Sequence, residues 1–379
     1  MVKGSKSLIR DINTQLVLKT IMEEGSISRA TLSKKLGLTK ATISAIVQEL
    51  LNKHLVREIG TLTVSSGRKP ILLEFASDCA YAISLDISQT QITILSATLA
   101  GENCVLHQYP TKNKRDCILE ELESAILSQL EDIPNCPYGL IGITLGIHGI
   151  IHEEEILFTS YSDYAHLDFI SSLREKFQVP VYVVNEANLS ALGDYSFHYP
   201  GQNVVELSIH SGIGLGIILN KQLFLGSKGY AGEFGHTTIQ IDGRPCPCGN
   251  FGCLEQYASE RAILSDFATE SHRPFVSCDE FISLYQKKDP IAIKFMNHFI
   301  KYMALAVNNI LNTLDPDLII LNSSFTMNFP HLVDDIKASV CGRHHKEYSL
   351  LPSELQDMSI LLGGICYSKM EFLKTDFTI

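Results

Sequence analysis

The chain has 379 residues, 45% hydrophobic and 19% charged, which fits an ordinary globular protein of two or three domains. It contains no run of about 18 apolar residues, and its first ten residues lack a long apolar segment, which argues against a membrane protein and predicts a cytoplasmic one. The net charge of −11 is unevenly distributed: residues 1–75 carry twelve Lys and Arg against six acids, and the remainder carries 19 against 36. We therefore expect only the N-terminal part to meet a polyanion.

Three helices are predicted in this basic head. Apolar residues recur at helical spacing over residues 8–24, and Gly25 ends that helix. A second helix over residues 29–36 is capped by Ser26 or Ser28 and stops at Gly37, and Thr39 caps a third over residues 40–53. The second and third helices, joined by the short segment L-G-L-T, form a helix-turn-helix pattern. The expected apolar stripe of the first helix consists of Ile9, Ile12, Leu16, Leu18 and Ile21 or Met22.

Two short strands follow, around the segment T-L-T-V-S-S-G, and predict a β-wing with two cations at its tip. A winged helix-turn-helix would place the start of its third helix in the major groove and its wing near the minor groove. The same elements occur in protein-interaction modules, but the charge distribution favours DNA. The residues expected to contact operator DNA are Arg29, Thr39, Lys40, Ala41, Thr42, Ser44, Arg68 and Lys69.

One histidine and three cysteines lie close together in the chain, at His236, Cys246, Cys248 and Cys253. One nitrogen and three sulfurs suit tetrahedral Zn²⁺, and four protein donors fill its coordination shell, which predicts a structural zinc. The other cysteines have no ligand spacing and are expected to be buried thiols.

Alternating strands and helices from Tyr81 onward predict an α/β body of two halves with a ligand-binding cleft between them. Asn185 and Glu186 follow a strand directly, where they either face the cleft or merely cap a helix. The glycine-rich segment 211–216 either cradles a phosphate or forms a hairpin turn, and the segment 145–151 makes a tight turn that contains His148.

The segments G-I-G-L-G-I, G-Y-A-G-E-F-G-H and C-P-C-G-N-F-G-C-L-E resemble the ROK family (repressors, open reading frames and sugar kinases), in particular its xylose-operon repressor branch. The resemblance implies a winged helix-turn-helix over residues 1–75 and an actin-like, sugar-kinase-like body over 76–379. Its lobes would be about 76–185 with the C-terminal helix, and about 186–365. By the same resemblance the zinc ligands are the four residues named above, and the sugar-binding residues are Asn185, Glu186, Glu233, His236 and Glu255.

Kinase members of the family carry Asp-x-Gly-Gly-Thr, whereas this chain reads Asp86-Ile87-Ser88-Gln89-Thr90, so that two side chains crowd the expected phosphate site. Glu186 replaces the catalytic Asp, and the late segment that is usually glycine-rich reads Asn322-Ser323-Ser324-Phe325. The sequence therefore predicts no enzyme. It predicts a repressor that binds palindromic operator DNA as a homodimer or dimer of dimers and responds to a xylose-like or glucose-like sugar. The alternative is a ROK sugar kinase.

Overall fold

The computed structural model describes residues 6–61, 70–112, 114–159, 164–165, 167–341 and 347–374. The N-terminal head contains three helices and a three-stranded sheet in the order β1-β3-β2. Ser28 accepts a hydrogen bond from the backbone N–H of Thr31, and Thr39 accepts one from that of Thr42, so both predicted caps form. The elements are α1 (Lys6–Glu24), β1 (Ile27–Ser28), α2 (Arg29–Leu36), α3 (Lys40–Asn52), β2 (Val56–Thr61) and β3 (Ile71–Phe75).

The predicted apolar stripe of α1 is wrong in its N-terminal half. Ile9 and Ile12 are each 53% exposed and Leu16 is 41% exposed, whereas Val17, Leu18 and Ile21 are buried. The buried face of α1 therefore includes Val17, the neighbour of the predicted Leu16, and only the second half of α1 packs on the rest of the head. The predicted cations of the wing tip, Arg68 and Lys69, lie outside the described residues.

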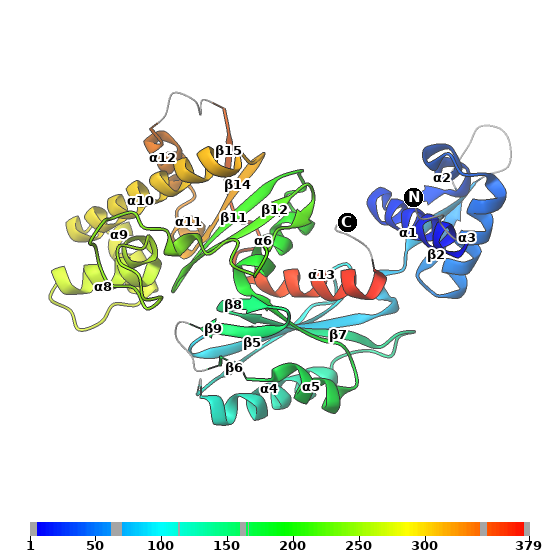
Figure 1. The fold of residues 1–379 in the computed structure, drawn as a ribbon, viewed down its shortest axis with the longest axis horizontal. Coiled ribbons are helices and arrows are strands. Elements are labelled where there is room, and N and C mark those ends of the chain that lie inside the picture. The colour runs from blue at the N-terminus through cyan, green and yellow to red at the C-terminus, as the bar shows by residue number, and fades with distance from the viewer. Residues whose placement is uncertain are drawn as a thin grey trace.

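The first lobe is built on a five-stranded sheet in the order β10-β7-β4-β5-β6. Strand β4 pairs with β5 antiparallel and with β7 parallel, as a meander followed by a crossover helix requires. Helices α4 and α5 cover one face of this sheet, and α13 (Ser359–Leu373) lies on the other (Figure 1). The elements are η1 (Ser77–Cys79), β4 (Tyr81–Ile87), β5 (Gln91–Thr98), β6 (Val105–Pro110), α4 (Arg115–Leu130), β7 (Leu140–Ile147), α5 (Phe169–Phe177) and β10 (Val181–Asn185). A hairpin of β8 (Gly149–His152) and β9 (Glu155–Thr159), which the sequence indicated only as a tight turn, follows β7.

The second lobe has its own five-stranded sheet in the order β13-β12-β11-β14-β15. Its largest apolar cluster joins this sheet to the long helix α10, whose N-terminus is capped by Asp289. The elements are β11 (Val204–Ile209), β12 (Ile213–Leu219), β13 (Gln222–Leu223), η2 (Phe234–His236), α7 (Glu255–Ala258), α8 (Glu260–Glu270), α9 (Cys278–Gln286), α10 (Pro290–Leu314), β14 (Leu318–Ser323), α11 (Ser324–Asn328), α12 (His331–Ser339), β15 (Ser349–Pro352) and η3 (Gln356–Met358).

Two helices cross between the lobes, α6 (Glu186–Phe197) and α13 (Ser359–Leu373). Glycines allow their backbones to touch: a Cβ on Gly363 would lie 1.8 Å from the carbonyl oxygen of Leu189, and one on Gly193 would lie 2.2 Å from that of Ser359. The neighbouring Gly364 faces the opposite way, where a Cβ would lie 2.0 Å from the hydroxyl of Ser84 on β4. Helix α13 is therefore fixed tightly to the first lobe and to α6.

The head and the first lobe share one hydrophobic core. Val17 and Ile21 of α1 and Leu50 of α3 belong to the same buried cluster as Leu361 and Ile365 of α13. Figure 1 shows the red helix α13 ending beside the blue head. Two hydrogen bonds reinforce the junction: the side chain of Gln15 donates to the carbonyl of Lys374 at 2.9 Å, and the hydroxyl of Tyr138 donates to the carbonyl of Lys53 at 2.7 Å.

The residues His236, Cys246, Cys248 and Cys253 are called the knot below. The prediction that the cysteines outside the knot are buried is correct for Cys79 and Cys366 and wrong for Cys104 and Cys341, which are exposed. The remaining three, Cys117, Cys136 and Cys278, are partly buried. Within the described ranges, no helix combines the length and the apolarity that crossing a bilayer would require.

Candidate functional site

A cavity between the two lobes collects the five residues that the sequence predicted to bind sugar. Asn185, Glu186, Glu233, His236 and Glu255 all line it, together with His148 and the turn 211–214. Its volume is about 50 Å³, far below the roughly 300 Å³ at which typical small-molecule sites begin. The lobes or side chains therefore have to move before a monosaccharide fits.

Asn185 and Glu186 stand where β10 ends and α6 begins. The side-chain oxygen of Asn185 accepts a hydrogen bond from the N–H of Asn188, so Asn185 is the N-cap of α6. Its amide group also donates to the carboxylate of Glu186 at 2.8 Å and to the carbonyl of Gly149 at 2.9 Å. The two alternatives left by the sequence are thus compatible, because the capping residue also lines the cavity.

His148 is the residue that the sequence placed near the site without a role. Its Nε2 lies 2.9 Å from a carboxylate oxygen of Asp86, and its Nδ1 lies 3.8 Å from one of Glu186. Burial by itself lowers the pKa of His148, but the charges of Asp86 and Glu186 and the hydrogen bond to Asp86 raise it to about 9. A charged imidazole therefore bridges the two acids.

Glu233 and Glu255 line the same cavity from the second lobe. Burial raises the pKa of Glu233 to about 7, and the neighbouring charges of Glu186 and Glu255 add to this. Glu255 is only 4% exposed, and its carboxylate lies 3.4 Å from the guanidinium of Arg261. Glu255 also accepts a hydrogen bond from the side chain of Gln256 at 3.2 Å. The cavity thus presents several carboxylate oxygens, which are acceptors for hydroxyl donors.

The glycine-rich segment 211–216 is a hairpin turn and the start of β12, the second of the two predicted alternatives. Its glycines serve close packing rather than a phosphate cradle. A Cβ on Gly212 would lie 2.9 Å from a carboxylate oxygen of Glu255, and one on Gly216 would lie 2.3 Å from the carbonyl of Ala187. Strand β12 therefore presses against the beginning of α6.

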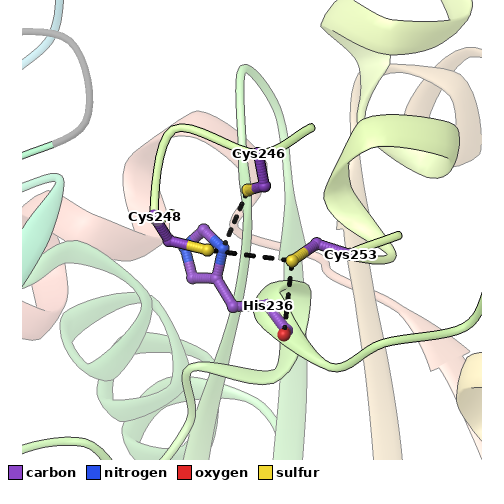
Figure 2. A group of neighbouring side chains, drawn as sticks. All are labelled: His236, Cys246, Cys248 and Cys253. Carbon is purple, nitrogen blue, oxygen red and sulfur yellow. Dashed lines mark hydrogen bonds between the residues drawn. The ribbon is translucent and has the colours of Figure 1, made fainter. Parts of the chain in front are cut away.

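The predicted metal ligands converge on one point. One ligand atom from each of His236, Cys246, Cys248 and Cys253 lies within 4.8 Å of all the others, and Figure 2 shows the three sulfurs grouped around the imidazole. The Sγ atoms of Cys248 and Cys253 are 3.7 Å apart, and Cys246 Sγ lies 3.4 Å from His236 Nδ1. The other ring nitrogen, Nε2, lies 3.7 Å from the carboxylate of Glu233.

These distances fit a metal ion with soft ligands. A tetrahedral zinc with Zn–S bonds of about 2.3 Å separates two sulfurs by about 3.8 Å, close to the observed 3.7 Å. Burial and the neighbouring thiols raise the pKa of Cys253 to about 12, so thiolates here need a cation to compensate their charge. The cluster can therefore hold a metal.

The candidate DNA-binding face is the exposed side of α3. Lys40, Ala41 and Ser44 are exposed, while the hydroxyl groups of Thr39 and Thr42 lie 2.9 Å apart within the cap. Arg29 pairs with Glu58 at 2.9 Å. Gln48, one turn beyond Ser44, is also exposed on this face, and it lies beyond the first turn of the helix, where the residues predicted from the sequence end.

Comparison with known families identifies both parts of the chain. The model of the ROK family matches residues 82–368, and that of a winged helix-turn-helix DNA-binding domain matches residues 10–57. The chain belongs to the ROK family. The resemblance inferred from the sequence motifs is thereby confirmed, as is the fold of a winged helix-turn-helix followed by a ROK body.

Among ROK relatives, the xylose repressor of Bacillus spizizenii is 36% identical over 368 residues, which cover 95% of each chain. The xylose repressor of Staphylococcus xylosus is 34% identical over 361 residues, covering 93% of each chain. The N-acetylglucosamine repressor of Escherichia coli is 24% identical and covers 85% of this chain and 83% of its own.

Among solved structures, a ROK family transcriptional regulator described as a homologue of the E. coli MLC protein superposes with a TM-score of 0.81 at 25% identity. The match covers 96% of this chain and 97% of that one, so it includes head and body. A ROK family glucokinase from Streptomyces griseus, in complex with glucose and AMPPNP, gives a TM-score of 0.68 at 22% identity. It covers 75% of this chain and 98% of the glucokinase, and it shows that the ROK body has the fold of a sugar kinase.

Proposed function

We propose that this protein is a sugar-responsive transcriptional repressor. The head, residues 1–75, would bind operator DNA, and the body, residues 76–379, would bind a sugar of the xylose or glucose type. The observation that carries the proposal is the acid-lined cavity between the lobes, in a chain that also contains a winged helix-turn-helix. Full-length relatives named xylose repressors support the same assignment.

The sugar would be held by hydrogen bonds to Asn185, Glu186, Glu233, His236 and Glu255. Carboxylates accept from sugar hydroxyls, and such charge-assisted bonds are stronger than neutral ones. The ion held by the knot would be Zn²⁺, and its part would be structural, because four protein ligands leave no coordination position open. His236 would bind it through Nδ1, which leaves Nε2 on the side of Glu233 for a hydroxyl.

Helices α6 and α13 provide a physical connection between the cavity and the head. Helix α6 begins at Glu186 in the cavity and crosses α13 at Gly363, and α13 shares its core with the head. We infer that a sugar which enlarges the cavity turns the second lobe against α13 and the head. The sugar shifts this equilibrium only by its difference in affinity for the two arrangements.

A repressor of this kind acts on two half-sites, and we propose that the chain works as a homodimer or dimer of dimers in the cytoplasm. Two heads would recognise a palindromic operator whose half-sites are separated by whole helical turns. The apolar residues exposed along α1, Ile9, Ile12 and Leu16, offer a surface for contact with a second copy.

Sugar phosphorylation is the alternative, and the cavity disfavours it. Glu186 occupies the position of the family's catalytic Asp. Burial raises its pKa, but its carboxylate is held by the amide of Asn185 at 2.8 Å and lies 3.8 Å from His148, so it would have to leave these partners to reach a sugar hydroxyl. Ser324, in the segment that is usually glycine-rich, donates both its backbone N–H and its hydroxyl to the buried carboxylate of Glu260. That negative charge would repel a nucleotide phosphate. Relatives named as repressors agree with a role that is not enzymatic.

The direct test is a gel-shift titration with DNA from the neighbourhood of the protein's own gene, with and without xylose or glucose. We expect binding that weakens steeply with salt and weakens further with the effective sugar. Glu255→Gln should abolish the sugar response and keep DNA binding, and Lys40→Ala should weaken DNA binding alone. Glu120→Gln, an exposed acid on α4, is the matched control. Absence of any salt-sensitive shift would refute the repressor, and ATP-dependent phosphorylation of either sugar would establish the kinase.

A further inference from the structure

A second cavity lies where the head meets the body. Its volume is about 330 Å³, within the range of small-molecule sites, which begins at roughly 300 Å³. The head contributes walls from α1, β2 and β3, and the body contributes walls from the β5–β6 turn, the end of α6 and α13. Much of the lining is apolar, from Ile21, Met22, Phe75, Leu99, Ala100 and Phe197.

Lys369 on α13 lines this cavity and is only 5% exposed. Within the part of the chain that the structure describes, its ammonium group makes no hydrogen bond and no ion pair. The stem of the side chain is buried, whereas the ammonium is not among the fully enclosed polar atoms that lack a partner, so it faces the space of the cavity. Such a group is retained in a fold when water or an anion reaches it.

Ser77 is a second buried polar residue with an open hydrogen-bonding group in the same cavity. It is 8% exposed, and its hydroxyl has no hydrogen-bond partner among the described residues. The other charged side chains of the lining do not neutralise Lys369. Arg57 and Glu74 pair with one another at 2.5 Å, and Glu102 is an exposed residue at the turn.

We propose that the junction cavity binds a small amphipathic anion. Its carboxylate or phosphate would meet the ammonium of Lys369 and the hydroxyl of Ser77, and its apolar part would lie against Phe75, Leu99 and Phe197. Charge-assisted hydrogen bonds in a partly desolvated site are strong and select for the anion. The site is separate from the sugar cavity and shares no lining residue with it.

Because head and body both line the junction cavity, its occupant binds one orientation of the head better than others. The anion is therefore a second effector of DNA binding, linked to the operator by its differential affinity for the two orientations. This effect on DNA rests on the proposed function, whereas the binding step does not.

Calorimetric titration of the full-length protein without DNA tests the binding step. The probes are benzoate and phenyl phosphate, with neutral benzyl alcohol and inorganic phosphate as comparisons. We expect at least one aromatic anion to bind in the micromolar to low millimolar range, and both comparisons to bind at least tenfold more weakly. Benzoate alone would indicate a carboxylate effector, and phenyl phosphate alone a phosphate effector.

Lys369→Met keeps most of the side-chain stem and removes the charge, and it should weaken anion binding at least tenfold. Lys301→Met, at an exposed lysine on α10, is the matched control and should change nothing. Ala100→Leu narrows the cavity without changing Lys369 and should also weaken anion binding. It tests the site independently of Lys369→Met, in case that variant fails to fold. Glu255→Gln should bind the anion as the unmodified protein does. Failure of both aromatic anions to bind, or equal binding by Lys369→Met, would overturn the proposal.

Discussion

Helix α13 has two neighbours of different character. Towards the head it contributes Leu361 and Ile365 to a continuous apolar core. Towards the second lobe it meets α6 through bare backbone at Gly363 and through two small apolar clusters that contain Ile360 and Cys366. These contacts lie beside a buried network in which Asn322 and Ser190 donate to the carboxylate of Glu206. An apolar core resists partial opening, whereas the buried carboxylate of Glu206 is destabilised by desolvation and by the neighbouring Asp194, which opening would relieve. We therefore expect the larger, sugar-driven motion to occur between the lobes, with a smaller adjustment of the head on the first lobe.

The knot lies on the second-lobe side of this division, and its removal should have the largest effect. Cys253→Ser, or chelation of the metal, should abolish metal binding. It should also weaken sugar binding by about 100-fold, because mutation of the groups that support a metal site commonly lowers metal affinity or activity 10–100-fold. Because the head core does not include the knot, operator binding should persist. Metal content by atomic absorption, sugar binding by calorimetry and a gel shift measure the three effects.

Cys104→Ser and Cys341→Ser replace exposed cysteines outside the knot and are the matched controls. Both should keep metal and sugar binding. Loss of operator binding in Cys253→Ser together with retained secondary structure would contradict the independence of the head from the second lobe.

The crossing of α6 and α13 can be disturbed without changing any polar group. Gly363→Ala places a methyl group only 1.8 Å from the carbonyl oxygen of Leu189. Overpacking of this kind costs about 1–3 kcal/mol of the free energy of unfolding, and the helices must separate to relieve it. We expect lower stability in urea denaturation and a weaker effect of sugar on operator affinity. Unchanged coupling would show that the crossing is not the route between the sites.

The sequence was most informative where the signals are local. The caps Ser28 and Thr39, the helix stop at Gly37 and the four knot residues were predicted because each interaction closes within about 20 residues of chain. The ROK motifs then supplied the fold. Helical spacing, in contrast, did not decide which apolar side of α1 faces the core, and the choice of Ile9 and Ile12 was wrong.

The features that the sequence did not reveal depend on distant contacts. His148 acts through Asp86, 62 residues away, so its motif alone gave no role. Gly363 and Gly364 mark a crossing only once Leu189 and Ser84 are placed beside them. The roles of the five cavity residues and of the residues expected to contact DNA stay predictions, because the position of a side chain does not by itself demonstrate binding.

The charged His148 should produce a smaller effect that depends on pH. Its pKa is raised from an ordinary 6.5 to about 9 in the folded protein, so its stabilising contribution is full below pH 6.5 and is lost as pH rises through about 9. The unmodified protein should therefore lose about 1–3 kcal/mol of stability over this range relative to His148→Gln. Urea denaturation of both proteins at pH 6 and pH 9.5 measures the difference. Parallel pH profiles would contradict a charged His148 between Asp86 and Glu186.

The central claim is that sugar in the cavity between the lobes changes the affinity of the head for DNA. Calorimetric titration of xylose and glucose into the protein, with and without its operator, tests it most directly. Linkage requires the operator to weaken sugar binding by the same factor by which sugar weakens operator binding. We predict a factor of at least five for the effective sugar, in line with typical coupling of about 5–150-fold. Equal sugar affinities in the presence and absence of operator would contradict the account.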